Sequence, residues 1–400
     1  MKTVIVGNGL AGTMAAKSLR ELDPSLEIEI IAGERYSYYP RPNLIDYVAG
    51  ALPYEKLFAF PPNWHERQNI AVRLATPVVR IDTAAGTVTT GDGRTSAFDR
   101  LLLANGSAAV IPPVRGADKK NVFVLRTLDD AQAILEALTT RRRVAVLGGG
   151  LLGLEIARAL KARGAEVSVN EFFDRLLPRQ LDPPGAALLK AQVERLGIGV
   201  RLGASAEEIT GEGGASGLRF QDGSSAEADM VVFAAGVRPN IALAKEAGIE
   251  ADRGVVVDDH LRTSHPAVYA AGDVAQHKGR VYGIIPASFD QARAAAYNML
   301  GREKRYEGTV PSNTLKVVGI FVTSVGLVNP EGPGYESIAK EDAGTGIYRK
   351  LVLKDGILEG AIWMGTKKGA SDIARLTVSR KNVATWKGEL LEDGFDLAGL

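Results

Sequence analysis

The sequence predicts an α/β fold with two parallel-sheet domains, followed by a smaller α+β domain. Three observations predict it. A strand, glycine-rich turn and helix occur near the start of the chain and again from residue 143, and short alternating strands follow residue 301. Parallel strands need crossover helices, so each copy of the pattern requires a sheet of its own. A chain of 400 residues, 46% of them hydrophobic, is long enough for two or three such domains.

The first copy starts at the N-terminus. An apolar run at 4–6 enters the motif Gly-x-Gly-x-x-Gly at 7–12, and a helical segment follows until Asp23-Pro24 ends it. The apolar run 28–31 supplies the next strand. In this context the three glycines allow a tight turn, let the backbone approach a pyrophosphate, and let the helix pack on the strand. The segment therefore predicts a dinucleotide-binding unit of the Rossmann type.

The second copy has the same layout. A strand at 143–147 leads into a second motif at 148–153, a helix expected from Leu154 to Arg163, and a strand at 166–169. An acidic residue about twenty positions after the last glycine accepts both ribose hydroxyls, and Glu34 and Glu171 stand near that place in their units. A 2'-phosphate would be repelled by Glu171, which favours NADH over NADPH, although Arg175 softens that preference.

Composition excludes several classes of protein. The net charge of +1 gives no bulk attraction to nucleic acid or to anionic membranes, and the sequence contains no cysteine. Structural disulfides, thiolate metal sites and catalytic thiols are therefore excluded. The four histidines show no metal-like spacing, so we expect no metal site. No apolar stretch reaches eighteen residues and the chain enters a strand at once, so we expect a cytoplasmic protein with no membrane span.

Several further segments resemble, in the same order, the FAD-dependent pyridine nucleotide-disulfide oxidoreductase superfamily. Residues 101–106 resemble its central ATG motif, with Asn105 in place of threonine, and residues 231–240 are similar to the second such motif. Residues 263–274 resemble the flavin signature, in which an aspartate, here Asp273, accepts a hydrogen bond from the ribityl chain.

The resemblance implies two Rossmann-like domains, with the NAD domain inserted into the FAD domain. It places the FAD-binding domain at 1–112 and 238–311, the NAD-binding domain at 113–237 and a C-terminal α+β domain at 312–400. FAD, bound non-covalently, is assigned to Gly7, Gly9, Leu10, Ala11, Gly12, Glu34, Arg35, Arg41, Pro42, Ala104, Asn105, Gly106, Gly272, Asp273, Pro286, Ala287 and Ser288. NADH is assigned to Gly148, Gly150, Leu151, Leu152, Gly153, Glu171, Ala235 and Gly236.

Two carboxylates are the candidate catalytic residues. Glu155, placed in the first helical turn after the second motif, matches a family glutamate that reaches toward nicotinamide and flavin. Relatives often pair it with a lysine, where this chain has Asp46. Two carboxylates brought together would repel, and one would tend to hold a proton. Pro286 is expected in the first turn of a helix running to Leu300, whose N-terminus would favour negative charge on a reduced flavin.

The Arg41-Pro42 pair and the absence of cysteine resemble the single-flavin reductases that serve rubredoxin or ferredoxin and the flavin module of nitrite reductases. The resemblance implies hydride transfer from NADH to FAD, then electron transfer to a small carrier protein, in a monomer or homodimer. Basic clusters at 141–143, 302–305 and 367–368 are candidate docking sites. Two alternatives remain: an oxidase, diaphorase or reductase component that uses oxygen, a quinone or another subunit, and an NADH-responsive flavoprotein sensor.

Overall fold

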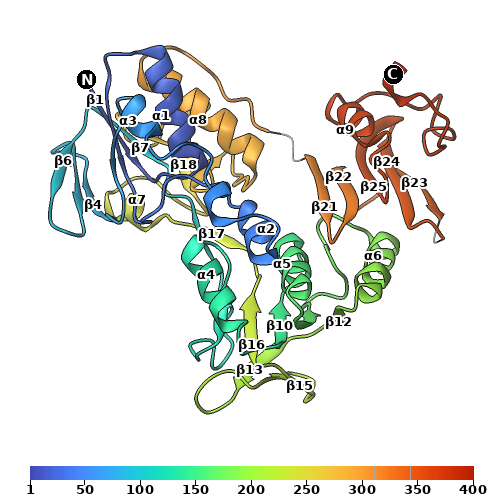
Figure 1. Ribbon diagram of the computed structural model, residues 1–400. Coiled ribbons are helices and arrows are strands. Elements are labelled where there is room, and N and C mark those ends of the chain that lie inside the picture. Colours follow the sequence, from blue (N-terminus) through green and yellow to red (C-terminus); the bar gives the residue numbers. More distant parts are fainter. Residues whose placement is uncertain (310–311, 343) are drawn as a thin grey trace. The chain divides into compact units, whose positions relative to one another are not determined.

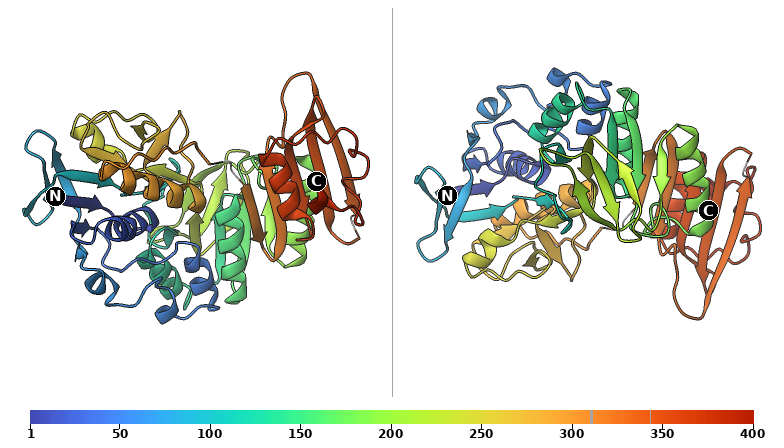
Figure 2. Two further views of the ribbon diagram at one scale, coloured as in Figure 1. Left: turned by 90° about the horizontal axis from the view of Figure 1, so that it is seen from above. Right: turned by 90° about the horizontal axis from the view of Figure 1, so that it is seen from below.

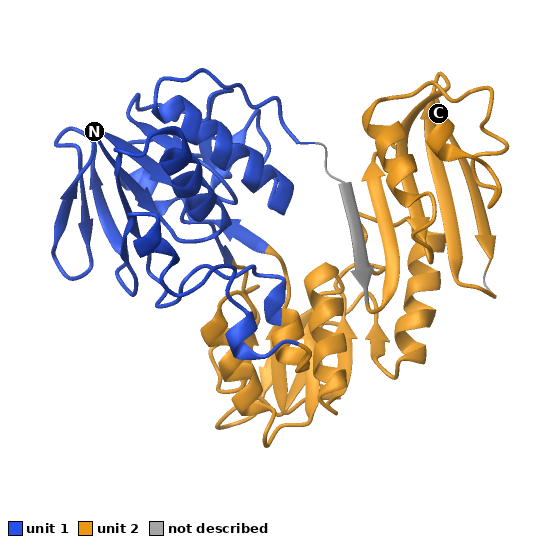
Figure 3. Ribbon diagram, turned by 45° about the horizontal axis from the view of Figure 1, so that its top comes forward, with its two compact units in different colours: residues 1–44, 52–108, 237–309 blue, residues 45–51, 109–236, 310–400 orange. Residues whose placement is uncertain are grey.

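The computed structural model describes residues 1–309, 312–342 and 344–400, which divide into two compact units (Figure 3). Unit 1 comprises residues 1–44, 52–108 and 237–309, and unit 2 comprises residues 45–51, 109–236 and 310–400. Segment 109–236 of unit 2 thus interrupts unit 1 in the sequence, as the predicted insertion of one domain into another requires. The expected domain boundary at residue 311 lies outside the described residues.

Unit 1 is built on a five-stranded parallel sheet with the strand order β19-β7-β1-β2-β3 (Figure 1). These strands are β1 (Lys2–Val6), β2 (Glu27–Ile31), β3 (Ala71–Arg73), β7 (Arg100–Leu103) and β19 (Val268–Ala270). The apolar runs predicted at 4–6 and 28–31 are therefore the middle of this sheet. Most of their side chains are buried, which is typical of a parallel sheet covered on both faces.

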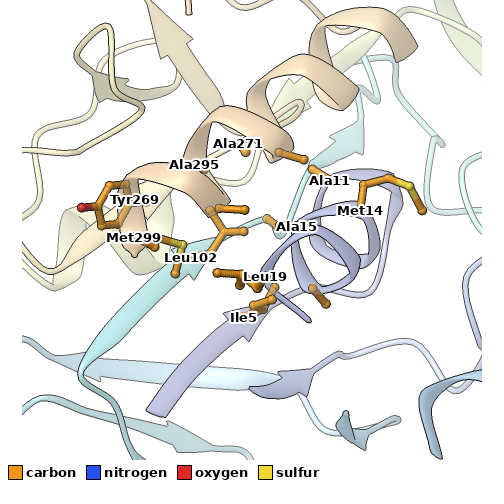
Figure 4. Packing of buried hydrophobic residues seen from close by; sticks show 14 of the residues in the cluster. Ile5, Ala11, Met14, Ala15, Leu19, Leu102, Tyr269, Ala271, Ala295 and Met299 are labelled. Carbon is orange, nitrogen blue, oxygen red and sulfur yellow. The ribbon is translucent and has the colours of Figure 1, made fainter. Parts of the chain in front are cut away.

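Two helices, α1 (Leu10–Leu22) and α8 (Ile285–Met299), pack side by side on this sheet (Figures 1 and 4). Their contact is rich in alanine, so the two backbones come close together over buried Leu19 and Leu102. Each fully buried leucine contributes about 1.5–3 kcal/mol through removal of apolar surface from water. The remaining elements of unit 1 are α2 (Asn43–Ala49, which continues into unit 2), the 3-10 helix η1 (Tyr54–Lys56), α3 (Trp64–Arg67), β4 (Val78–Asp82), β5 (Thr87–Thr90), β6 (Thr95–Ala97), β8 (Ser107–Ala109), β17 (Val237–Pro239), α7 (Ala242–Glu246), β18 (Val255–Val257) and β20 (Ala275–His277).

Unit 2 repeats the parallel-sheet plan with the strand order β12-β11-β10-β16-β9. Its elements up to residue 236 are β9 (Val122–Val124), α4 (Leu128–Ala137), β10 (Arg143–Leu147), α5 (Leu151–Ala162), β11 (Glu166–Asn170), α6 (Pro183–Arg195), β12 (Gly199–Arg201), β13 (Ala206–Thr210), β14 (Gly217–Phe220), β15 (Ser225–Glu227) and β16 (Met230–Phe233). The prediction of two separate sheets, one for each glycine motif, is confirmed.

The C-terminal part of unit 2 is the predicted α+β domain. Its antiparallel sheet has the order β21-β22-β25-β24-β23, and helix α9 packs against β22 and β25 (Figures 1 and 2). The elements are β21 (Ser312–Val317), β22 (Ile320–Gly326), β23 (Tyr335–Asp342), β24 (Ile347–Lys354), β25 (Ile357–Met364) and α9 (Ala370–Val378). The hairpin expected from the alternating pattern at 348–363 is β24 and β25.

One helix boundary differs from the prediction. The helix expected from Leu154 to Arg163 is α5, which begins at Leu151. Gly150 is its N-cap residue, so the leucines at 151 and 152 already belong to the first turn. Glu155 consequently lies in the second turn of the helix and not in the first.

The packing of α5 on its sheet leads to a stability prediction. Leu160 is fully buried on α5, whereas Leu196, at the end of α6 in the same unit, is 46% exposed. We expect Leu160→Ala to lower the free energy of unfolding by about 2–5 kcal/mol, because it leaves a cavity. Leu196→Ala should change it by less than about 0.5 kcal/mol. Urea denaturation of both variants is the measurement, and similar effects would contradict the assigned core.

Candidate nucleotide sites

The first glycine motif is a tight backbone turn in unit 1. A Cβ atom added to Gly12 would lie 2.0 Å from the carbonyl oxygen of Gly7, so α1 can meet the strand end only without a side chain there. Gly9 faces open space and is the N-cap of α1, with no side-chain cap hydrogen bond. The N–H groups of the first helical turn, at Leu10 and Ala11, therefore have no capping side chain and suit a phosphate group.

Three distant segments meet beside this turn. A Cβ atom on Gly272 would lie 2.8 Å from Cβ of Ala11 and 3.7 Å from Oγ of Ser288, at the start of α8. The Gly272 N–H donates a 2.8 Å hydrogen bond to Oε1 of Gln291, which ties the loop to α8. Asp273 accepts a 2.9 Å hydrogen bond from the Ser107 hydroxyl. The structure thus brings together the motif, the Asp273 loop and the start of α8, which the sequence assigned to one ligand.

The helix predicted around Pro286 is confirmed. Helix α8 runs from Ile285 to Met299, with proline in its first turn and no side-chain cap at Ile284. Ala287 and Ser288 are buried there. The beginning of α8 therefore offers further N–H groups close to Gly272.

Asn105, which replaces the threonine of the ATG motif, forms a reciprocal pair with Asn240. The Asn105 side-chain amide donates to the Asn240 carbonyl at 2.9 Å, and the Asn240 amide donates to the Asn105 carbonyl at 2.8 Å. Asn105 follows Ala104, whose carbonyl oxygen would lie 2.3 Å from a Cβ atom on Gly7. Gly106 has a φ of 65° and completes this turn.

Two amides beside the glycine motif keep an unused polar atom. Within the described part of the chain, Oδ1 of Asn105 and Nδ2 of Asn8 are buried without a hydrogen-bond partner. The Thr13 hydroxyl donates to Oδ1 of Asn8 at 3.1 Å, and Nε2 of His65 lies 3.4 Å from the same oxygen. Burial lowers the pKa of His65, which favours its neutral form. Unused buried polar atoms beside an uncapped helix fit a polar ligand such as a dinucleotide.

Glu34, Tyr39 and Arg41 form a polar group after β2. The Arg41 guanidinium is hydrogen-bonded and ion-paired with Glu34. The Tyr39 hydroxyl donates to Oε2 of Glu34 at 2.6 Å and accepts from Arg41 at 2.6 Å. Nε of Arg35 donates to the Tyr36 hydroxyl at 2.9 Å, and Pro42 is exposed. The structure therefore joins Arg41 to the acidic residue assigned to ribose, an ion pair that the sequence did not indicate.

The second glycine motif repeats the first in unit 2. A Cβ atom on Gly153 would lie 1.9 Å from the Gly148 carbonyl oxygen. Gly150 faces open space and is the uncapped N-cap of α5, ahead of Leu151 and Leu152. Ala235 and Gly236 are exposed just beyond the end of neighbouring β16.

Glu171 is a buried carboxylate at the end of β11, only 5% exposed. One of its oxygens accepts a hydrogen bond from the Gly149 N–H, and the other accepts one from the Phe173 N–H at 2.9 Å. Each oxygen of an ionised carboxylate can accept a second hydrogen bond. Glu171 is therefore held against the glycine turn with acceptor capacity for two ribose hydroxyls.

Glu155 has a cationic partner that the sequence reasoning missed. Nη2 of Arg158, one turn further along α5, lies 2.9 Å from Oε2 of Glu155 and 3.7 Å from Oδ1 of Asp46. The other oxygen of Glu155 accepts a 2.7 Å hydrogen bond from the Val318 N–H of the C-terminal domain. Repulsion between the two carboxylates was expected, but Arg158 contacts both. Its spacing of three residues from Glu155 was the available signal.

No group of His, Cys, Asp or Glu that could hold a metal ion occurs among the described residues. Nor does any helix within residues 1–309, 312–342 and 344–400 have the length and apolar character needed to cross a membrane.

Comparison with known proteins supports this arrangement. Residues 1–297 match the model of the pyridine nucleotide-disulphide oxidoreductase family. The chain belongs to this family. Residues 311–381 also match the model of the rubredoxin NAD+ reductase C-terminal domain. The predicted resemblance to this family and the predicted α/β fold are confirmed.

Two sequence relatives and two solved structures illustrate the range of the family. The chain is 39% identical to a nitrite reductase [NAD(P)H] of Bacillus subtilis over 90% of its length and 45% of the relative. It is 31% identical to the NADH-rubredoxin oxidoreductase of Clostridium acetobutylicum over 91% of both chains.

A crystal structure of that Clostridium oxidoreductase matches with a TM-score of 0.82 and 29% identity, over 95% of this chain and 96% of the other. The covalent putidaredoxin reductase–putidaredoxin complex matches with a TM-score of 0.89 and 26% identity, over 99% and 97%. The chain spans about half the length of its nitrite and nitrate reductase relatives, between 39% and 51%.

The position of Glu171 leads to a prediction for NADH binding. Glu171→Gln keeps the side-chain shape but removes the charge and one acceptor oxygen. We expect the Michaelis constant for NADH to rise by about tenfold, because hydrogen bonds to charged groups contribute roughly 1.5–3 kcal/mol. Steady-state assays with ferricyanide as acceptor are the measurement. Glu166→Gln, in the exposed start of β11, is the control, and an unchanged constant in Glu171→Gln would contradict the ribose role.

The contact between Glu155 and Arg158 leads to a second prediction. Because the pair is partly buried, with 20% and 32% side-chain exposure, a double-mutant cycle should give a coupling free energy of about 0.5–1 kcal/mol. The more exposed pair Lys190–Glu194 in the same unit should give about 0.3–0.5 kcal/mol. Urea denaturation of alanine variants measures both cycles. A coupling free energy near zero for the first pair would show that Arg158 does not stabilise Glu155.

Proposed function

We propose that this chain is an NADH-dependent flavoprotein reductase that passes electrons to a small electron-carrier protein such as rubredoxin. The observation that carries this proposal is the combination of two dinucleotide-type turns with a sequence that has no cysteine. A thiol relay of the kind found in disulfide reductases is impossible without sulfur. The similarity to an NADH-rubredoxin oxidoreductase over 91% of both chains supports the same conclusion.

The FAD site proposed here lies in unit 1. Gly7, Gly9 and Gly12 with the first turn of α1 would hold the pyrophosphate, Glu34 the adenosine ribose, and Asp273 the ribityl chain. Arg41 and the Asn105 turn complete the polar surroundings. In this assignment the FAD-binding domain is 1–112 and 238–311, the NAD-binding domain is 113–237 and the C-terminal domain is 312–400. Held by these residues, FAD would supply the chemistry that takes hydride from NADH and passes the electrons to the acceptor.

The protein's own residues would act mainly by binding and orientation. The N–H groups at the start of α8 favour negative charge nearby, by about 1 kcal/mol for a partly exposed helix end. The second glycine turn would bind the pyrophosphate of NADH, and Glu171 would bind its adenosine ribose. Hydride transfer from the nicotinamide needs no side-chain base, so these residues would act by orienting NADH. Glu155, with Arg158 as its cation, is our candidate for the residue nearest the nicotinamide, and Asp46 belongs to the same charge group.

The basic clusters remain predicted docking sites, although internal contacts engage several of their members. Arg143 forms a 2.6 Å ion pair with Asp229, and Arg305 lies 3.5 Å from Asp259. Nζ of Lys368 donates to the Asp393 carbonyl at 3.0 Å. We also propose that the protein works in the cytoplasm, where NADH is supplied, as a monomer or homodimer.

The alternative of an NADH oxidase or diaphorase has one observation in its favour. The chain is 33% identical to an NADH oxidase of Methanocaldococcus jannaschii over 82% of its length. A reductase component that serves a quinone or another subunit is a related alternative, because several relatives are about twice as long as this chain. An NADH sensor would bind the same ligands without rapid turnover.

The electron acceptor is tested by anaerobic reduction followed by rapid mixing. The purified protein should be yellow, and NADH titration should bleach its flavin absorbance. We expect the reduced protein to be reoxidised by rubredoxin at least about an order of magnitude faster than by oxygen or a quinone, with a rate that falls as salt screens the docking charges. Faster reoxidation by oxygen would favour an oxidase. Negligible turnover with every acceptor, together with an NADH-dependent change of oligomeric state, would favour the sensor.

A further inference from the structure

Two exposed phenylalanines directly follow Glu171. Phe172 is 65% exposed and Phe173 is 54% exposed, and Phe172 is the most exposed of the large apolar side chains that the structure describes. Their ring centroids lie 5.4 Å apart at an interplanar angle of 86°, so the edge of one ring meets the face of the other. Exposed aromatic rings lose favourable burial, and a pair of them in one loop is typical of a binding surface.

The loop that carries these rings is held on both sides by backbone hydrogen bonds. The Glu171 N–H donates to the Arg201 carbonyl at 2.8 Å, and the Gly203 N–H donates to the Phe173 carbonyl at 2.8 Å. The Phe173 N–H donates to the Glu171 carboxylate at 2.9 Å. These hydrogen bonds therefore fix the loop in the conformation that leaves both rings exposed.

The Phe172 ring would lie beside the part of NADH that carries the adenine base. This step rests on the proposed binding of NADH at the second glycine turn, with its adenosine ribose on Glu171. In adenosine the base is attached to the sugar carbon next to the one that bears the 2'-hydroxyl. A 2'-hydroxyl bound to Glu171 therefore brings the base within a few ångströms of that carboxylate, where the next residue in the chain is Phe172.

We propose that the adenine ring of NADH stacks on Phe172 and that Phe173 supports this ring edge to face. Every base has an apolar π-face, and stacking on an aromatic side chain is a common way to bind it. Glu171 would then recognise the ribose and Phe172 the base. Adenine binding would account for the apolar surface that Phe172 and Phe173 expose beside the buried Glu171 carboxylate.

The charges around this loop fit NADH better than NADPH. Nη1 of Arg175 pairs with Asp174 at 2.9 Å, and Nη2 of Arg201 pairs with Asp222 at 2.8 Å. The Arg201 guanidinium also lies over the ring of Phe220, 4.1 Å from its centroid. Both arginines thus have acidic partners, and a 2'-phosphate would meet the carboxylate of Glu171.

The test compares Phe172→Ala, Phe172→Tyr and the control Leu196→Ala, an exposed apolar side chain in the same unit. The readouts are the inhibition constant of ADP-ribose and the Michaelis constants of NADH and of reduced nicotinamide mononucleotide, with ferricyanide as acceptor. We expect Phe172→Ala to raise the ADP-ribose and NADH constants by about tenfold, in line with base stacking on aromatic rings. The mononucleotide constant should not change, because that donor lacks adenosine. The Leu196→Ala control should resemble the wild type, and Phe172→Tyr should raise these constants far less than Phe172→Ala, because it keeps the aromatic face.

Glu171→Gln separates failure of this proposal from failure of the proposed function. If Phe172→Ala leaves the ADP-ribose constant unchanged while Glu171→Gln raises it, adenine stacking is overturned and the NADH site stands. If neither variant changes that constant, the assignment of NADH to the second turn fails as well. An equal loss with NADH and with the mononucleotide donor would also overturn the stacking, because the adenosine half would then not be the part affected.

Discussion

The parallel-sheet parts of both units depend on one constraint, which is the close contact between the start of a helix, α1 or α5, and the glycine turn before it. At Gly12 and at Gly153, any side chain would fall within about 2 Å of a carbonyl oxygen of the same turn. Because the backbone of each turn is so close, the helix begins directly at the end of the strand and its N–H groups remain uncapped. The uncapped N–H groups on which the proposed phosphate sites depend are therefore a consequence of how α1 and α5 pack on their sheets.

The two units differ in how each holds the acidic residue that follows its glycine motif. In unit 2, Glu171 is buried and accepts backbone hydrogen bonds, so its position is fixed by the turn itself. In unit 1, Glu34 lies in a loop and is held by Arg41 and Tyr39. The two carboxylates proposed to bind ribose are thus held by backbone hydrogen bonds in unit 2 and by side chains in unit 1. Without cysteine anywhere in the sequence, no thiol accompanies either site.

The C-terminal domain is joined to the inserted segment by polar contacts that include candidate site residues. The Val318 N–H binds Glu155, and Asp182, at the start of α6, accepts a 2.7 Å hydrogen bond from the Tyr348 hydroxyl and pairs with Lys350 at 3.0 Å. Desolvation raises the pKa of Tyr348, which keeps its hydroxyl protonated as the donor to Asp182. Removing one partner of the buried Asp182–Lys350 pair would leave the other charge unpaired, which costs about 3–5 kcal/mol.

Local pattern alone determined a large part of this protein. Apolar runs at 4–6 and 28–31, the two glycine motifs, Pro286 at a helix start and the hairpin at 348–363 are all set by neighbours a few residues apart, and the structure has each of them. Only tertiary structure decided which distant residues meet: Ser107 with Asp273, Asn105 with Asn240, and the C-terminal Val318 with Glu155. Such partners depend on how the strands are ordered in a sheet, and that order is not encoded in the spacing of a single motif.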